Sequence, residues 1–255
     1  MSQRVEVHKR SAFSLVELSI VLIIIGLLVG GVMAGRSLIR AAELRNILVE
    51  HDQWNKAIDT FRDYYRSLPG DYANATNTWT GTANGNGNGF INNGEHFRFW
   101  QHLALAGFIE GEYSGVAANV NRPVVGTEIP ASKIRKGAGW LMWTARDRDG
   151  RVTCGSCNVN ALVLGNISTT GSIHNNTGIL PIVSPKELWG MDNKADDGMP
   201  TTGVIQAGQR SNTCVNGSDP TATYITTTTT LECSISFPRT EEADEWGWDR
   251  YNERP

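Results

Sequence analysis

The 255-residue chain has no excess of basic charge. Its 23 Lys and Arg residues are outnumbered by 26 Asp and Glu residues, which gives a formal net charge of −3 at pH 7. No stretch interleaves Lys or Arg with aromatic residues, as the grooves of nucleic-acid-binding proteins do. We therefore expect no nucleic acid among the partners of this protein.

The chain also lacks the local signatures of common catalytic sites. It contains no nucleophile elbow, no phosphate-binding P-loop and no dinucleotide-binding glycine fingerprint. His51, His96, His102 and His174 lie far apart, with no metal-site or catalytic spacing. We expect a protein that is not an enzyme.

Proline and charge are both missing from the first part of the chain. No proline precedes Pro69, and Glu17 is the one charged residue between Phe13 and Ala34. This apolar run is long enough for one bilayer crossing, which takes about 20 residues. The segment before it carries Arg4, Lys9 and Arg10 against Glu6. Because basic residues favour the cytoplasmic side, the N-terminus should stay inside and the rest of the chain should lie outside.

The helical pattern continues beyond the apolar run. Between residues 38 and 68, apolar and aromatic residues and one His recur at alternating spacings of three and four. They are Leu44, Ile47, His51, Trp54, Ile58, Phe61, Tyr65 and Leu68. We predict one helix from about Phe13 to about Ser67, roughly 80 Å long, whose first half crosses lipid and whose second half docks on a soluble domain. A secretory signal peptide cleaved at "VMAGR" is the alternative, and the continuing pattern disfavours it.

The residues from Ala12 to Glu17, "AFSLVE", followed by an unbroken apolar helix, resemble the class III signal of type IV prepilins and type II secretion pseudopilins. The resemblance implies that a prepilin peptidase cuts between Ala12 and Phe13 and N-methylates Phe13, so that Glu17 takes the fifth mature position. The sequence departs from the family at Ala12, where Gly is usual. An uncleaved single-pass anchor is the alternative.

The resemblance also implies a role for Glu17. A carboxylate in such a run costs about 2.5–3.5 kcal/mol on insertion scales, so its retention indicates a use. In the family it pairs with the terminal amine of a neighbouring subunit and sets the register of the filament. The implied partners are other pilin or pseudopilin subunits, the prepilin peptidase, the assembly platform and the inner membrane.

Three functions remain open at this point. The first is a structural subunit, major or minor, of a type IV pilus or related filament. The second is a pseudopilin of a type II secretion system, and the third is a membrane-tethered binding or enzymatic domain. For the filament readings we expect a single-pass inner-membrane protein with its head in the periplasm, which then enters a periplasmic or extracellular filament.

The predicted organisation has a leader at 1–12, a helix at 13–68 and a globular head at 69–255. The helix consists of a membrane and polymerisation half, 13–35, and an amphipathic half, 36–68. The expected fold class is α+β and pilin-like, with the long helix packed on a head that contains an antiparallel sheet.

The head is predicted to begin where Pro69-Gly70 breaks the helix. Residues 96–111 read as a helix with Phe97, Trp100, Leu103 and Ala104 on one side, closing at Gly107 or Gly111. Short β-branched or aromatic segments bounded by Gly, Asn and Asp read as strands. They are 139–145, 160–167, 202–208 and 221–237, the last including the Thr-rich run.

The loop "NGNGNGFINNGE", residues 84–95, matches the twelve-residue EF-hand template position by position. The candidate calcium ligands are Asn84, Asn86, Asn88, Phe90 through its carbonyl, Asn92 and Glu95. Because Asn stands in place of the usual Asp, the affinity should be weak, in the range of about 10⁻⁴–10⁻³ M. The alternative is a polar Gly/Asn turn loop without a metal. Asp71 and Asp196-Asp197-Gly198 are predicted to be turn residues.

Four cysteines, Cys154, Cys157, Cys214 and Cys233, fall on the predicted outer side, where disulfides form. Four cysteines allow three pairings, of which the sequence-local one joins 154 with 157 and 214 with 233. A staple across 214–233 is also what the pilin resemblance implies. Redox and zinc alternatives for "CGSC" would need a βαβ context or a second matching pair, and the sequence shows neither.

Overall fold

The computed structural model describes residues 14–92, 94–145, 159–173, 178–208 and 213–239. The chain divides into two compact units, Met1–Glu43 and Leu44–Pro255. The boundary between the units falls inside the first helix.

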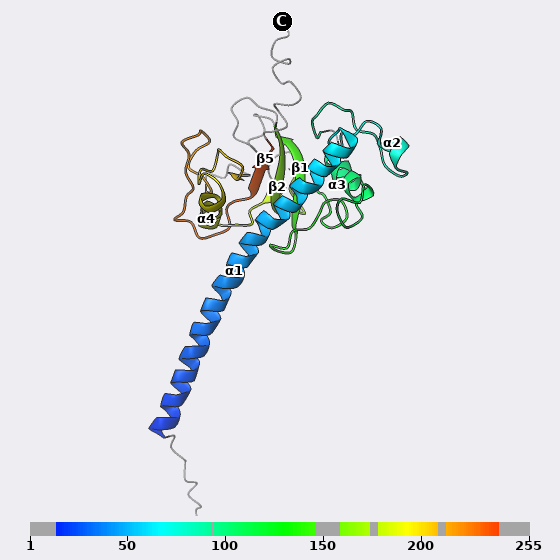
Figure 1. The fold of residues 1–255 in the computed structure, drawn as a ribbon. Coiled ribbons are helices and arrows are strands. Elements are labelled where there is room, and N and C mark those ends of the chain that lie inside the picture. Colours follow the sequence, from blue (N-terminus) through cyan, green and yellow to red (C-terminus); the bar gives the residue numbers. More distant parts are fainter. Residues whose placement is uncertain (1–13, 93, 146–158, 174–177, 209–212, 240–255) are drawn as a thin grey trace, which may run out of the picture. The chain divides into compact units, whose positions relative to one another are not determined.

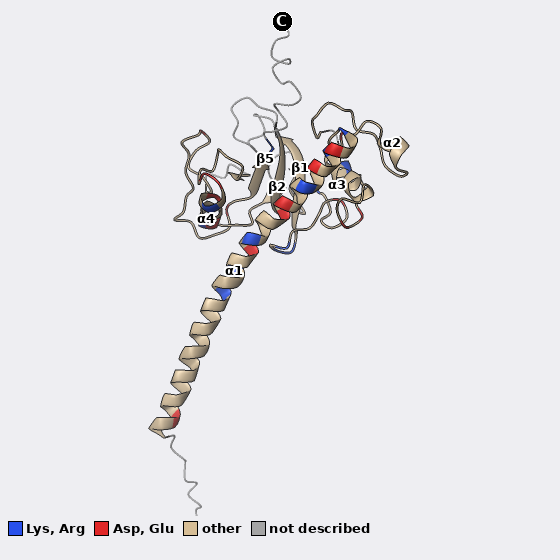
Figure 2. Ribbon diagram, viewed as in Figure 1, with Lys and Arg blue, Asp and Glu red and all other residues tan. Residues whose placement is uncertain are grey.

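The first helix, α1, spans Leu15–Tyr65, which confirms the predicted long N-terminal helix (Figure 1). In the first unit this helix is uncharged over a long stretch after one acidic position near its start (Figure 2). Its large apolar side chains are all exposed there, from Leu15 at 85% to Val21 at 50%. No proline interrupts the i to i−4 hydrogen bonds, so the helix runs on into the second unit.

In the second unit, the predicted seam of α1 is the face that packs on the core. Ile47, Ile58 and Phe61 are fully buried, and Leu44, Trp54 and Tyr65 pack partly buried against the same core. The helix ends at Tyr65, two residues before the expected end. Arg66 takes the left-handed conformation (φ 53°), and its N–H donates to the Arg62 carbonyl oxygen at 2.8 Å, as in a common helix C-cap.

A five-stranded antiparallel sheet forms the centre of the head, as predicted. Its strands are β1 (Ala138–Ala145), β2 (Val159–Ile167), β3 (Ile179–Leu180), β4 (Gln206–Ala207) and β5 (Ile235–Pro238). They lie in the order β1-β2-β5-β4, and β3 pairs with β2. Their near-continuous apolar sequence fits strands that are covered on both faces. Trp140 and Phe237 lie on one face, with ring centroids 5.7 Å apart.

Three helices complete the fold: α2 (Ala75–Thr78), α3 (Glu95–Leu105) and α4 (Pro185–Ala195). The expected helix near 96–111 is α3, which contacts β1, while α4 lies toward the β5 side of the sheet (Figure 1). Phe97, Trp100 and Leu103 are buried as predicted, but Ala104 is only half-buried. The helix closes before Gly107, which takes a positive φ.

Two strand predictions were too long. In 221–237 the residues from Ile235 form a strand, whereas the Thr run 226–230 lies in turns and coil. The run offers exposed hydroxyls and no alternating apolar face to bury, so β propensity alone does not place it in the sheet. In 202–208 the ladder is confined to β4, because the N–H groups of Val204 and Ile205 donate to the Asp196 carboxylate instead.

Glu50 fastens α1 to the sheet. Its side chain is 5% exposed, and its Oε2 accepts from Ser132 Oγ at 2.6 Å and from Trp140 Nε1 at 2.8 Å. Its Oε1 accepts from the Lys133 N–H at 2.8 Å. One carboxylate therefore satisfies three donors from β1 and the segment before it, and these bonds are of the strong, charge-assisted kind.

We expect Glu50→Ala to lower the free energy of unfolding by about 3 kcal/mol, because each buried donor left without an acceptor costs about 1–3 kcal/mol. Urea unfolding of the full chain in detergent, followed by Trp fluorescence, measures this change. The matched control is Asp52→Ala, which removes an exposed pair with Lys56 and should cost less than about 1 kcal/mol. Equal losses in the two variants would contradict the role given to Glu50.

Candidate functional site

Glu17 lies in the first turn of α1 and accepts a hydrogen bond from Ser14, the residue before the helix. The Ser14 N–H donates to Glu17 Oε2 at 2.9 Å, and the Val16 N–H donates to Ser14 Oγ at 3.3 Å. A carboxylate is favoured at this place by the N–H groups and the dipole of the helix end. The expected processing residues, Ala12 and Phe13, lie outside the described residues. Glu17 is thus positioned to accept a hydrogen bond from a nitrogen donor at the start of the helix.

The exposed apolar side chains of α1 form a continuous surface from Leu15 to Ile39. Such a surface is not stable in contact with water and requires lipid or other apolar helices around it. By length and composition, α1 is a helix that could cross a membrane, which suggests, weakly, a single-pass membrane protein.

The Asn/Gly loop of the head is folded around the carboxylate of Asp71. Asp71 is 2% exposed, its Oδ1 accepts from the N–H groups of Gly87 (2.7 Å) and Asn88 (3.1 Å), and its Oδ2 accepts from Gly89 (2.7 Å). Burial raises the pKa of Asp71, and the loop N–H groups counteract part of that rise. Asp71 is therefore the internal anion of this loop and more than a turn residue.

The predicted calcium ligands bind N–H groups of the protein. The side-chain oxygens of Asn84, Asn86 and Asn88 accept from the N–H groups of Thr76, Asn88 and Phe90. Glu95, which is also buried, accepts from the Asn86 N–H through Oε1 and from the Asn92 N–H through Oε2, both at 3.0 Å.

This geometry does not favour a cation in the loop. The loop turns three N–H donors toward Asp71, whereas an EF-hand turns oxygen ligands toward its ion. Asn92 differs from the other candidate ligands, because its side-chain oxygen is buried and accepts no hydrogen bond from the described residues. Calcium binding by residues 84–95 stays a prediction.

His102 fixes the base of the same loop. The Gly70 N–H donates to His102 Nδ1 at 2.9 Å, so Nδ1 carries no proton. His102 Nε2 lies 3.1 Å from Thr82 Oγ1 and 3.3 Å from the Ala83 carbonyl oxygen. Burial lowers the pKa of His102 to about 4. The imidazole is neutral at physiological pH and joins the end of α1 to the start of the loop.

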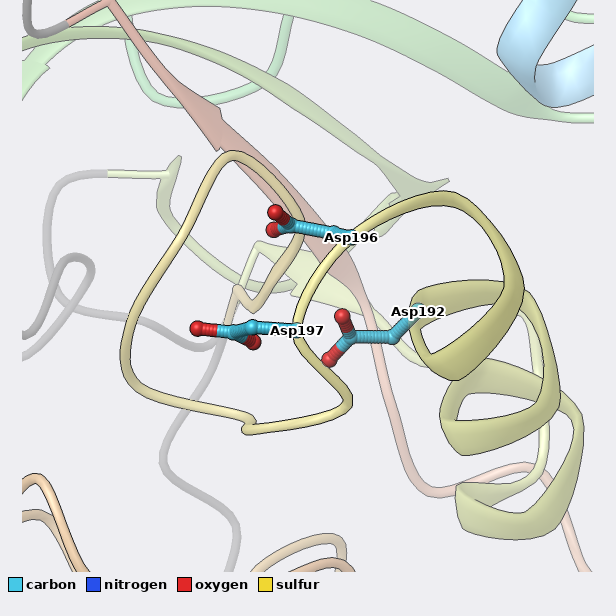
Figure 3. A group of neighbouring side chains, drawn as sticks. All are labelled: Asp192, Asp196 and Asp197. Atoms are coloured by element: carbon cyan, nitrogen blue, oxygen red, sulfur yellow. The ribbon is translucent and has the colours of Figure 1, made fainter.

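A second group of acidic side chains stands at the end of α4. Asp192 projects from the last turn of the helix, and Asp196 and Asp197 from the loop that follows (Figure 3). Their carboxylates lie within 4.8 Å of one another. Burial raises the pKa of Asp192 to about 6, and the two neighbouring carboxylates contribute to the rise.

Each of these carboxylates already accepts a hydrogen bond from its surroundings. Asp192 accepts from the Gly198 N–H at 3.0 Å and from the Tyr224 hydroxyl at 2.7 Å. Asp197 accepts from the Met199 N–H at 2.8 Å and from Thr202 Oγ1 at 2.6 Å. Asp196-Asp197-Gly198 forms the predicted turn, with Gly198 at φ 76°. The group holds the loop after α4 in place, and its geometry alone does not make it a metal centre.

Cys214 and Cys233 form a disulfide with 5.3 Å between their Cα atoms, as the sequence-local pairing predicts. Cys154 and Cys157 lie outside the described residues. The hydrogen bond from Tyr224 to Asp192 ties the disulfide-closed loop to α4. The C-terminal part of the head is thereby closed by one covalent and one polar contact.

Sequence reasoning missed α4 and with it Asp192. The signal was present, because Ser184 and Glu187 form an S-x-x-E capping box at the start of that helix. Asp71, Glu50 and His102 had no comparable signal, since their donors lie 16 to 90 residues away.

Comparisons of the chain with family models, with curated proteins and with solved structures gave no match.

We expect His102 to make the head less stable at acidic pH. Its pKa falls from 6.5 in the unfolded chain to about 4 in the folded one, so between those values the unfolded chain binds more protons. The stability that the neutral ring contributes is complete above pH 6.5 and is lost as pH falls toward 4, by about 3 kcal/mol in all.

The measurement is the difference in unfolding free energy between the wild type and His102→Gln, followed from pH 7 to pH 4. The difference should fall with pH in this window. Other titrating groups, such as His51 and Asp192, are present in both proteins and cancel. Thr82→Ala, which keeps the imidazole, should retain the wild-type pH dependence. A difference that does not change with pH would show that a charged His102 is tolerated.

Proposed function

We propose that this chain is a pilin-like structural subunit of a type IV pilus or related filament. A prepilin peptidase removes residues 1–12, Phe13 becomes the N-methylated terminus, and the subunit polymerises through the apolar part of α1. Before assembly the subunit spans the inner membrane once, with its head on the periplasmic side.

The observation that carries the proposal is the pairing of a processing-type sequence with an exposed apolar helix. "AFSLVE" overlaps the start of a helix whose large apolar side chains remain at least half exposed from Leu15 to Ile39. A subunit that moves from lipid into a bundle of identical helices keeps such a surface covered at both stages. A chain that only needed an anchor would have no use for a carboxylate in it.

The hydrogen bond from the Ser14 N–H supports the assembly role of Glu17. After the proposed cut, the new amino group would lie one residue before the Ser14 N–H that Glu17 already accepts. A carboxylate held at a helix N-terminus is a suitable partner for an amine, whether of its own chain or of a neighbour. The N–H groups of the cap keep Glu17 in place until the neighbouring subunit arrives.

The head fits a structural subunit. In the part of the chain that the structure describes, the acidic groups at Asp71 and at Asp192 are engaged in holding loops. A pseudopilin of a type II secretion system would share the processing, the helix and the pairing. A tethered binding domain would share the helix but keep the leader.

Processing can be tested by the intact mass of the protein purified from membranes. We expect the chain to begin at Phe13 with one added methyl group. Ala12→Leu, which places a bulky residue at the cleavage site, should leave the leader attached. Phe13→Ala shows whether methylation of the new terminus depends on the Phe side chain. A wild-type chain that retains residues 1–12 would overturn the proposal and favour the tether.

Assembly can be tested with Glu17→Ala. Removal of the charge should leave membrane insertion intact, since the helix becomes more apolar. It should reduce recovery of the subunit in sheared filaments by about tenfold or more, the factor for loss of one pair worth about 1.4 kcal/mol or more. Immunoblots of membrane and filament fractions measure both quantities.

The matched control is Ser14→Ala, which removes the cap hydroxyl but keeps the backbone N–H on Glu17. This variant should assemble nearly as well as the wild type. If Ser14→Ala and Glu17→Ala lose filaments equally, Glu17 acts only as a helix cap and not as half of an intersubunit pair.

A further inference from the structure

Three Asn-Gly dipeptides follow one another in the loop: Asn84-Gly85, Asn86-Gly87 and Asn88-Gly89. In this dipeptide Asn loses its side-chain amide most readily, because glycine has no Cβ to keep its backbone nitrogen away from the Asn side chain. The dipeptide recurs at Asn216-Gly217, in a different loop, and at Asn93-Gly94, of which Asn93 lies outside the described residues.

Deamidation of Asn proceeds in two steps. The glycine nitrogen attacks Cγ of the preceding Asn, forming the N–Cγ bond of a succinimide. The Cγ–Nδ2 bond breaks, and the amide leaves as ammonia with the proton of the attacking N–H. Water then opens the imide at either carbonyl, which leaves Asp or isoaspartate. The net change is Asn plus water to an acid plus ammonia, without any oxidant or cofactor.

In the folded loop each attacking nitrogen is held by a hydrogen bond. The Gly85 N–H donates to the Tyr72 carbonyl oxygen at 2.9 Å. The N–H groups of Gly87 and Gly89 donate to the two carboxylate oxygens of Asp71, each at 2.7 Å. The Gly87 N–H also lies 3.1 Å from the backbone carbonyl oxygen of Asp71. A nitrogen in such a bond keeps its proton and points away from the side chain it would attack.

The electrophilic side chains are held as well. Oδ1 of Asn84, Asn86 and Asn88 accepts a backbone N–H at 2.9, 3.1 and 2.9 Å, respectively. Both partners of each reaction are therefore fixed, and ring closure needs a local opening of the loop. The bonds to buried Asp71 are charge-assisted, so they contribute most to the cost of that opening.

Asn216-Gly217 provides an internal comparison. Its Asn side chain is also hydrogen-bonded, to Thr223 at 2.8 and 2.9 Å. In the described part of the chain, however, the Gly217 N–H donates no hydrogen bond. The two loops thus share the dipeptide and the held side chain, and they differ at the attacking nitrogen.

We propose that residues 84–89 are a latent deamidation site that the Asp71 carboxylate keeps unreactive. Water for the second step has access, since a pocket of about 260 Å³ is lined in part by Asp71, Gly87 and Gly89. The first conversion places a new carboxylate beside two buried ones, Asp71 and Glu95. Like charges at this distance repel, so one event loosens the loop and promotes the next. This inference does not depend on the proposed function.

The test is site-resolved peptide mapping by mass spectrometry of the full-length protein, kept in detergent at mildly alkaline pH and sampled over days. In the wild type, Asn86 and Asn88 should convert at least about tenfold more slowly than Asn216, because only opened molecules react. In Asp71→Ala the rate at Asn88 should rise by about tenfold, while Asn216 stays unchanged. The rate at Asn86 should rise less, because the Gly87 N–H keeps the backbone carbonyl oxygen of residue 71 as an acceptor.

Asn84 distinguishes local release from global unfolding, because Gly85 is held by the Tyr72 carbonyl and not by the Asp71 side chain. Local release accelerates Asn86 and Asn88 alone. The matched control is Asp197→Ala, a loop carboxylate with no neighbouring Asn-Gly, which should leave the rates at Asn86 and Asn88 unchanged.

Two results would overturn the proposal. One is wild-type conversion of Asn86 and Asn88 as fast as that of Asn216. The other is an unchanged or slower rate at Asn88 in Asp71→Ala, which would make the carboxylate irrelevant or a general base for the attack. If Asp71→Ala unfolds the head, the deamidation rate at Asn84 rises too. In that case the rates at Asn86 and Asn88 in the wild type are compared with those in a synthetic peptide of residues 82–91. A wild-type rate equal to that of the peptide overturns the proposal, and one about tenfold lower supports it.

Discussion

Hydrogen bonds from backbone N–H groups to carboxylates hold together a head that has little regular structure. Asp71 and Glu95 organise the Asn/Gly loop, and Glu128 accepts from Ala118 and Val124 in the next one. Asp196 holds the turn before β4. Each bond spares a loop N–H from being buried without an acceptor, and the charge strengthens it. Single carboxylate side chains thus accept the backbone hydrogen bonds that neighbouring strands would accept in a sheet.

The two parts of α1 have different surroundings, although the helix is uninterrupted. Over Leu15 to Ile39 every large apolar side chain is exposed, whereas from Ile47 onward one face is buried in the head and carries Glu50. Two glutamates of α1 accept hydrogen bonds in different surroundings. Glu17, which is exposed, accepts the Ser14 N–H at the start of the helix, while Glu50, which is buried, accepts donors from β1 and the segment before it. The buried charge of Glu50 is tolerated because N–H and O–H donors surround its oxygens.

Features set by local periodicity were predictable from the sequence, and features set by distant donors were not. The seam of α1, the helix α3 and the strands β1 and β2 follow from the spacing of apolar residues such as Phe61, Trp100 and Leu162. The roles of Asp71 and Glu50 depend on partners 16 to 90 residues away, and nothing near them in the sequence indicates those partners. The Thr run failed for the opposite reason, since its local β propensity had no tertiary contact to support it.

The stability of the head depends on pH in two opposing ways, through its loop carboxylates and through its buried histidines. Lys56 and Asp52 form an ion pair on α1, and Arg239, which follows β5, pairs with Asp59 of α1. The loop carboxylates Asp71 and Asp192 accept N–H and O–H hydrogen bonds. Burial raises the pKa of Asp192 to about 6, so the folded chain takes up this proton first and gains stability as pH falls from 6 toward 3.8. His51 and His102, whose pKa values burial lowers to about 4, lose stability over nearly the same range. Because the two effects have opposite signs, protonation of Asp192 offsets part of the stability that the head loses through His51 and His102 as pH falls.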